Sequence, residues 1–187
     1  ARPTPPTAHH GLFALFDSMV LIMGVLLWVS SLADAQRSSL VAAHISGVAA
    51  AVAAAVLTAM AYSWFTTGRL STPMISHALT AALFASASAG MLPTGIAVLA
   101  GVLAALCAIP FAYWLKSRSG VRDDGGLYGA LLLPSAAGVA LTGLFATGQY
   151  LTGWAGVGPE SYMNQPGLGV TGWLTGGDIG QFTAQAI

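Results

Sequence analysis

Two histidines, His44 and His77, are the side chains best placed for chemistry, because each interrupts a long apolar stretch. An ionisable side chain is costly in an apolar environment, so each is a candidate functional residue. Each could ligate the metal of a haem or a chlorophyll together with a second subunit, or simply bond to a neighbouring helix. They lie near opposite ends of consecutive stretches, which predicts a separation in depth of roughly 15–20 Å at ~1.5 Å per residue. We therefore expect that one haem would not take both.

The acidic residues and the single cysteine do not predict a catalytic centre. Asp17 lies near the expected start of the first apolar stretch, where the helix dipole favours a carboxylate; a role in proton relay or toward a substrate is the alternative. Asp123 and Asp124 precede the last stretch and are expected to cap it. Cys107 cannot form an internal disulfide, since it is the only cysteine. The sequence has no nucleophile triad, metal-ligand spacing or phosphate-binding glycine motif, so we do not expect an enzyme.

The composition indicates an integral membrane protein. Hydrophobic residues make up 56% of the 187 residues and charged residues only 6%, and the mean hydropathy is +0.75. A soluble domain of this size needs far more charge to cover its surface, whereas lipid accepts apolar side chains. The formal net charge is zero and there is no basic run, so nucleic acid is excluded as an expected partner. The expected surroundings are the lipid bilayer and other integral membrane subunits.

Five apolar stretches have the length of about 20 residues that a helix needs to cross a bilayer. Alternation with a period of two is absent, which favours helices over a barrel. The predicted fold is therefore all-α, a polytopic membrane bundle of five helices. The predicted spans are Gly11–Leu32, Leu40–Tyr62, Pro73–Met91, Gly95–Leu115 and Leu127–Thr147.

The spans divide the chain into three parts. Residues 1–10 read as a polar, proline-rich leader, residues 11–148 as the five-helix domain, and residues 149–187 as a tail of loops and short helices. The end of the tail could begin a further helix. Five cations fall on one side of the predicted spans and Arg37 alone falls on the other. The positive-inside rule then places the N-terminus in the cytoplasm and the tail on the opposite side of a cell (inner or cytoplasmic) membrane.

The last span and the loop before it resemble a segment of the Amt/Rh family of ammonium transporters. Residues Arg122 to Ala146 contain a double Asp, a short apolar run and a closing Thr-Gly-Leu-Phe-Ala, in the order found in that family. The stretches Trp64–Leu70 and Ala78–Pro93 resemble a family link and its small-residue-rich eighth helix. The likeness implies the C-terminal half of the fold, helices six to ten and the start of eleven.

The resemblance also implies that the transport residues have been lost. Leu131 stands where the family has a pore histidine, and Ser46 with Gly47 stands where it has an Asn-Thr pair. A leucine can neither donate nor accept a proton. The expected function is thus a non-catalytic, structural or accessory subunit of a larger membrane complex, for example a respiratory or photosynthetic one. One alternative is a component of an ammonia or small-solute channel paired with a separate N-terminal half. A second alternative is a subunit that binds haem or chlorophyll through His44 or His77, although no cofactor is predicted.

Overall fold

A computed structural model describes residues 8–31, 38–118, 127–147, 171–177, 179–180 and 182–183. Within these ranges the chain is helical apart from turns and one isolated β-bridge between Thr147 and Thr171. Five α-helices lie in the described part, as the sequence predicts. They are α1 (Ala8–Ser31), α2 (Ser38–Thr67), α3 (Thr72–Ala85), α4 (Thr94–Arg118) and α5 (Leu127–Phe145), with short 3₁₀ turns η2 (Ala89–Met91) and η4 (Trp173–Thr175).

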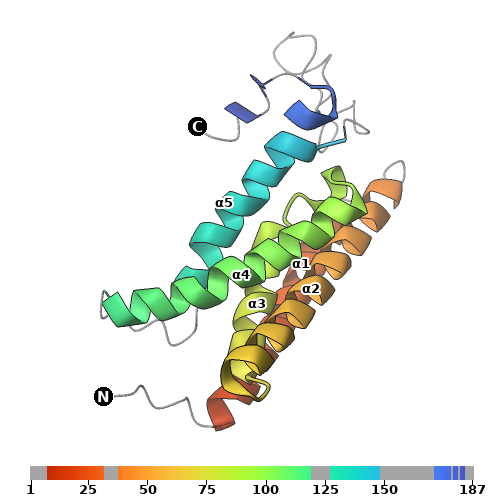
Figure 1. The fold of residues 1–187 in the computed structure, drawn as a ribbon. Coiled ribbons are helices and arrows are strands. Elements are labelled where there is room, and N and C mark those ends of the chain that lie inside the picture. Colours follow the sequence, from red (N-terminus) through yellow and green to blue (C-terminus); the bar gives the residue numbers. More distant parts are fainter. Residues whose placement is uncertain are drawn as a thin grey trace.

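Successive helices run in opposite directions, as expected of spans joined by short links (Figure 1). The segments Val41–Thr67 and Thr94–Leu115 are long and apolar enough to cross a membrane. Three shorter apolar segments, Leu15–Leu27, Thr72–Ala85 and Leu131–Phe145, complete the bundle. The predicted class, an all-α membrane bundle, is confirmed.

The turn between α2 and α3 follows from two residue types. Gly68 has a φ of +70°, in the left-handed region that a glycine enters without a steric penalty, and it ends α2. The Gly68 amide donates to the carbonyl of Trp64 at 2.9 Å, which satisfies one of the last helical acceptors. Pro73 then stands at the start of α3, where a missing amide hydrogen costs nothing.

The third helix is shorter than its predicted span, because α3 ends at Ala85 rather than Met91. Beyond Ala85 the backbone bonds contract from the α to the 3₁₀ spacing, with Ala89 bonded to Ser86 and Met91 bonded to Ser88, both at 2.9 Å. The hydropathy of this Ala/Ser run is compatible with a span, but serine side chains offer the backbone alternative bonds and weaken the helix. The prediction of a helix up to Met91 is therefore wrong.

The first helix begins at Ala8, inside the leader expected from the sequence. Its first turn contains no acidic residue. Asp17 therefore lies in the body of α1, and the expectation that it caps the first turn is wrong. The predicted span begins at Gly11, whereas His9 and His10 before it are also helical.

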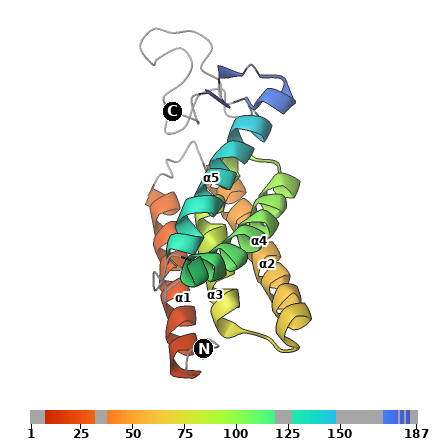
Figure 2. The same ribbon diagram turned by 60° about the vertical axis from the view of Figure 1, so that its left-hand side comes forward.

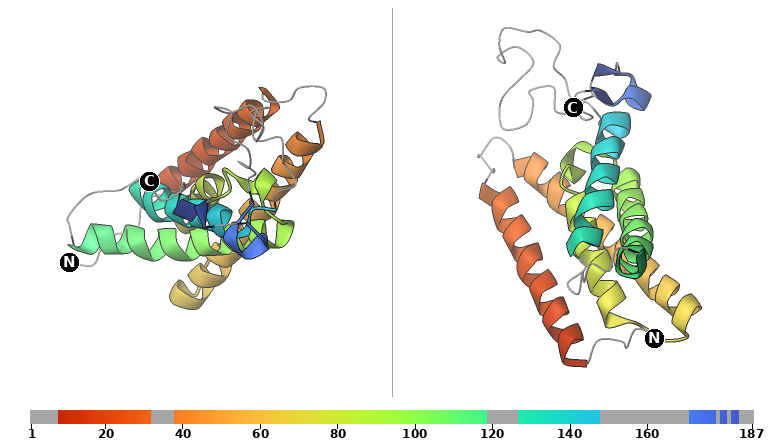
Figure 3. Two further views of the ribbon diagram at one scale, coloured as in Figure 1. Left: turned by 90° about the horizontal axis from the view of Figure 1, so that it is seen from above. Right: turned by 90° about the vertical axis from the view of Figure 1, so that its left-hand side faces the viewer.

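The core of α2, α3, α4 and α5 is made almost entirely of small side chains. A Cβ added to Gly101 on α4 would collide with the carbonyl of Ala51 on α2, and one added to Gly138 on α5 would collide with the carbonyl of Ala85. In lipid, such small residues let backbones approach closely and gain dispersion energy. Ten buried residues form the main cluster: Ala55, Ala59, Ala78, Ala81, Ala82, Ala85, Ala104, Ala105, Ala108 and Ile109. Figure 3 shows α4 (green) crossing α2 (orange to yellow).

The first helix lies at one edge of the bundle, where it packs mainly against α3 (Figure 2). Its other face is apolar and open. Seven large side chains on it are more than half exposed: Leu12, Phe13, Phe16, Met19, Val20, Met23 and Leu27. Exposed apolar side chains spaced three or four residues apart form the continuous outer stripe expected where a helix meets lipid or another helix.

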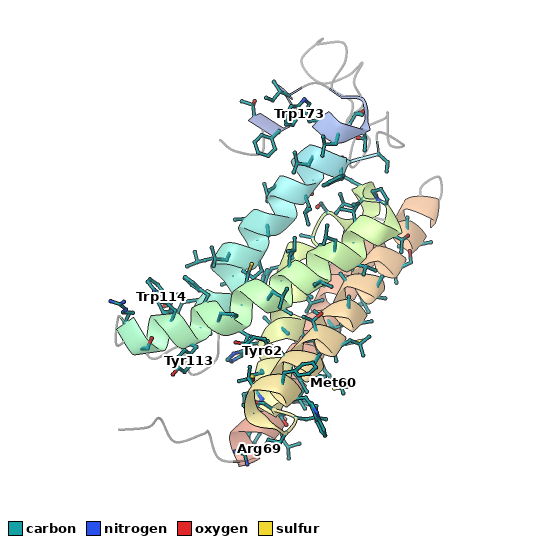
Figure 4. All side chains as sticks on the ribbon, viewed as in Figure 1. Met60, Tyr62, Arg69, Tyr113, Trp114 and Trp173 are labelled. Atoms are coloured by element: carbon teal, nitrogen blue, oxygen red, sulfur yellow. The ribbon has the colours of Figure 1, made fainter. Side chains whose placement is uncertain are left out.

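Large exposed aromatic side chains lie near the end of α2, near the end of α4 and at the start of α5. Trp64 and Phe65 near the end of α2 are 60% and 87% exposed, and Tyr113, Trp114 and Tyr128 are also exposed. Tyr113 and Trp114 project from the end of α4, whereas Trp173 marks the opposite end of the molecule (Figure 4). Aromatic residues at the two ends of a bundle match the belts found at the two interfaces of a bilayer.

Candidate functional site

Among the residues that the structure describes, His44 is the most buried ionisable side chain, and it lies where α2 passes the break after α3. Its side chain is 0% exposed. Its Nδ1 atom accepts a hydrogen bond from the backbone amide of Gly90 at 3.2 Å. The contact is close, since a Cβ on Gly90 would lie 3.0 Å from Nδ1. Because Nδ1 accepts, the neutral ring carries its hydrogen on Nε2. The Gly90 amide lies beyond the end of α3, and His44 supplies its hydrogen-bond acceptor.

Hydroxyl groups meet on the other side of the same break. Ser88 bonds to Thr142 on α5 through their side-chain oxygens. Thr142 also donates to the carbonyl of Gly138 in its own helix, at 2.9 Å. Thr142 is buried and Ser88 is half-buried, and their bond fixes α5 against the 86–93 segment. The 86–93 segment is therefore held from both sides, by His44 of α2 and Thr142 of α5.

The end of α5 is tied to the same segment and to the described part of the tail. The Thr147 amide donates to the carbonyl of Met91 at 3.0 Å, and the Gly172 amide donates to the carbonyl of Ala146 at 2.8 Å. Gly172 packs so tightly on α5 that a Cβ there would lie 2.5 Å from the Leu144 carbonyl carbon. In the tail, the Thr183 amide bonds to the Ile179 carbonyl at 2.9 Å with helical spacing. Residues 148–170, most of the predicted tail, lie outside the described residues.

A second polar cluster joins α1 to α3. The Ser18 side-chain oxygen lies 2.9 Å from that of Ser76 and 3.3 Å from that of Thr80. Ser18 is 3% exposed and Ser76 4% exposed. Ser76 and Thr80 are four residues apart and so share one face of α3, where Ser18 inserts between them. Interhelical hydroxyl bonds of this kind are a common attachment between helices in lipid.

The residues singled out from the sequence do not converge on one site. His77 is half-buried near the start of α3, whereas His44 contacts Gly90 beyond the other end of that helix. The eight residues from His77 to Ala85 alone span about 12 Å at ~1.5 Å per residue. The two histidines thus lie toward opposite ends of α3, and their separation in depth across a bilayer stays a prediction. Leu131 lies half-buried on α5, between the start of that helix and Pro134.

Sequence reasoning missed the hydroxyl groups that the structure brings together. Ser18, Ser76, Thr80, Ser88 and Thr142 are spread over four segments of the chain, and single hydroxyls in apolar stretches are common. The four-residue spacing of Ser76 and Thr80, which puts both on one helix face, is the sequence feature that could have indicated a polar contact there. Among the residues that the structure describes, no three His, Cys, Asp or Glu side chains gather to hold a metal ion.

The bundle, its small-residue core and its aromatic ends define a polytopic α-helical membrane protein. The sequence model of the Ammonium Transporter Family matches residues 2–187, so the chain belongs to that family. No curated protein sequence matches the chain.

Among solved structures, a crystal structure of a Mep2 mutant from Candida albicans is similar in fold, with a TM-score of 0.60 and 22% sequence identity. The match covers 79% of this chain and 31% of the Mep2 chain. The chain thus spans about a third of the length of that solved relative, and the likeness at this identity concerns the fold. The family suggested by the residues around Arg122–Ala146 is confirmed.

Proposed function

We propose that this chain is a non-catalytic, integral membrane subunit that keeps the ammonium-transporter fold and serves as a structural component of a larger membrane complex. The main support for the proposal is that Leu131 stands at the position of a pore histidine. The family resemblance aligns this residue with a pore histidine, and the half-buried leucine on α5 has no group that can bind or pass a proton. Its neighbours Leu132 and Leu133 are exposed apolar side chains, which extend the apolar surface of α5.

The proposal includes an orientation. The aromatic end at Trp64, Tyr113 and Trp114 also carries Arg69 and Arg118, so the positive-inside rule places this end in the cytoplasm. The start of α1 then lies on the cytoplasmic side and the end of α5 on the opposite side. Cysteine-labelling of single-cysteine variants in a Cys107→Ala background, at Arg69 and at Trp173, tests the orientation from either side of intact vesicles.

The bond between His44 and Gly90 argues against the cofactor alternative. A histidine that ligates a metal through Nε2 carries its hydrogen on Nδ1, where it usually donates to a carbonyl or carboxylate. In this protein Nδ1 accepts from the Gly90 amide, which is the opposite tautomer. His77 is too far along α3 to be a second ligand. Purified protein is expected to be colourless above about 350 nm, and a haem or chlorophyll spectrum would contradict this part of the proposal.

Native mass spectrometry of the full chain, tagged in its own cells and extracted in mild detergent, tests the subunit role. We expect a hetero-complex of fixed stoichiometry. A homo-oligomer without other subunits would contradict the role and would favour the channel alternative.

Ammonia flux into proteoliposomes is the complementary measurement. We expect the chain, alone or in its complex, to conduct no faster than protein-free liposomes, because the position aligned with the pore histidine holds Leu131. An active ammonium transporter reconstituted in parallel is the positive control. The proposed loss of transport would be overturned by a flux well above the protein-free rate, if the bulky variant Leu131→Trp abolishes that flux.

A further inference from the structure

Asp17 is a carboxylate in the middle of an apolar helix surface. It lies nine residues after Ala8, where α1 begins, which places it about 14 Å along the helix at ~1.5 Å per residue. It also falls inside the apolar segment Leu15–Leu27. Its side chain is exposed, and no cation of the described residues forms an ion pair with it. A helix dipole does not reach this far, so the capping role that explains an acidic residue in a first turn does not apply.

The hydroxyl cluster fixes the direction in which Asp17 points. Ser18 is held inward by Ser76 and Thr80, so the rotation of α1 about its axis is set. Consecutive residues on a helix are about 100° apart, which directs Asp17 to the flank of the α1–α3 contact. Phe16 and Val20, 64% and 55% exposed, lie on the neighbouring row of the same open surface.

A shallow, open groove runs along this flank of α1. It is lined by two rows of side chains with a spacing of four residues: Phe16, Val20 and Gly24 in one row, and Asp17, Leu21 and Val25 in the other. A Cβ added at Gly24 would meet nothing within 4 Å, so the groove is open there to the bare backbone. Rows of this spacing are the ridges between which another helix packs, and a glycine gives that helix room to approach.

These observations define the chemistry of the occupant. A bare carboxylate among apolar side chains is unfavourable in lipid, and ionisable residues inside membranes are usually paired with one another. A Lys or Arg side chain would neutralise Asp17, and only a helix can carry it at this depth without exposing backbone polar groups. We propose that the α1 groove docks a transmembrane helix of a partner subunit that carries a Lys or Arg at the depth of Asp17. The inference rests on the subunit role proposed above, to which it adds the docking surface and the charge of the partner.

A synthetic single-span Leu/Ala helix with one Lys at the depth of Asp17 is the probe. Its association with the full chain is measured by energy transfer in phosphatidylcholine vesicles, next to an otherwise identical helix with Leu at that position. We expect the Lys helix to bind roughly tenfold more tightly, in line with polar contacts between membrane helices. Asp17→Asn should remove the preference. Asp17→Lys should transfer it to a probe with Glu at the same position.

Met19→Asn is the matched control, because Met19 is an exposed residue of α1 outside the groove. It should leave the preference for the Lys helix unchanged. Equal binding of the two probes, or a preference that survives Asp17→Asn, would overturn the proposal. A third outcome would also overturn it: phosphatidylethanolamine stabilises the wild-type chain but not Asp17→Asn, and the Lys helix is not preferred. Asp17 would then bind a lipid amine.

The docking surface and the subunit role fail separately. If native mass spectrometry gives the same hetero-complex, equally stable, for the wild-type chain and Asp17→Asn, the subunit role stands and the docking surface is overturned. If the Lys helix is preferred but no hetero-complex is recovered, the binding chemistry of the groove stands and the subunit role fails.

Discussion

In the core of α2 to α5, the helix backbones pack in direct contact with one another. The contact between α1 and α3, in contrast, is made by larger side chains and a few hydroxyl groups. Gly101 passes the carbonyl of Ala51 with no room for a methyl group, but Gly24 of α1 faces open space. Lipid removes the hydrophobic driving force between helices, so contact distance and hydrogen bonds decide which helices adhere. The core therefore depends on the absence of side-chain atoms, whereas the attachment of α1 depends on the presence of polar ones.

The largest effect is expected from a single methyl group in the core. Gly101→Ala places a Cβ against the Ala51 carbonyl, which only a shift of α4 away from α2 can relieve. We expect the free energy of unfolding to fall by about 3 kcal/mol, at the upper end of overpacking costs. Thermal or denaturant unfolding in detergent micelles measures it.

Gly24→Ala in α1 is the matched control for this change. It adds the same methyl group where nothing lies within 4 Å, and should stabilise the helix by up to about 1 kcal/mol. An equal decrease in the free energy of unfolding for Gly101→Ala and Gly24→Ala would contradict the difference between a close-packed core and an open surface on α1.

An intermediate effect is expected from His44→Leu. The variant keeps the volume of the site roughly unchanged but leaves the buried Gly90 amide without its acceptor. An unsatisfied buried group costs about 1–3 kcal/mol, so the loss of stability should be about 2 kcal/mol. Ile45→Val, at the exposed neighbouring position, should change stability by less than about 0.5 kcal/mol. A neutral His44→Leu would mean that the 86–93 segment does not depend on α2.

The smallest effect is expected where α1 is attached. Ser18→Ala removes the bonds to Ser76 and Thr80 and should cost about 0.6 kcal/mol, a typical value for a polar contact between membrane helices. Ser46→Ala is the control, because the Ser46 hydroxyl bonds only to the Ala43 carbonyl in its own helix. In a double-mutant cycle, Ser76→Ala should add little to Ser18→Ala. A loss larger than that of Gly101→Ala would reverse the comparison between the two regions.

The sequence was sufficient for the class of fold, because hydropathy reports length and composition directly. Each of the five predicted apolar stretches corresponds to one helix of the structure. The ends of helices were harder to predict. The hydropathy of residues 86–91 is as compatible with a span as that of the residues before them, although the serines weaken a helix. The contacts of Ser88 with Thr142 and of Gly90 with His44, which hold the broken backbone, join parts of the chain far apart in sequence.

The candidate site was predictable only in part. His44 was singled out because it is ionisable, but its partner is a backbone amide, and a backbone group has no signature in a sequence. A helix start at Gly11, where the predicted span begins, favours a helix cap for Asp17. Its place within α1 depends on the turn that begins at Ala8, whose small and polar residues give no hydrophobic signal.

The break after Ala85 has a consequence for biogenesis. The 14 residues of α3 reach about 21 Å at ~1.5 Å per residue, short of the ~30 Å that a hydrocarbon core requires. A segment of this length is followed by backbone that is not α-helical, in which the Gly90 amide bonds to His44 of α2 and the Met91 carbonyl accepts from Thr147 after α5. These two backbone groups would face lipid without those partners if the segment left the translocon alone. It can be released into the bilayer only once α2 and α5 cover that backbone. For this part of the chain, insertion and tertiary folding are therefore a single event.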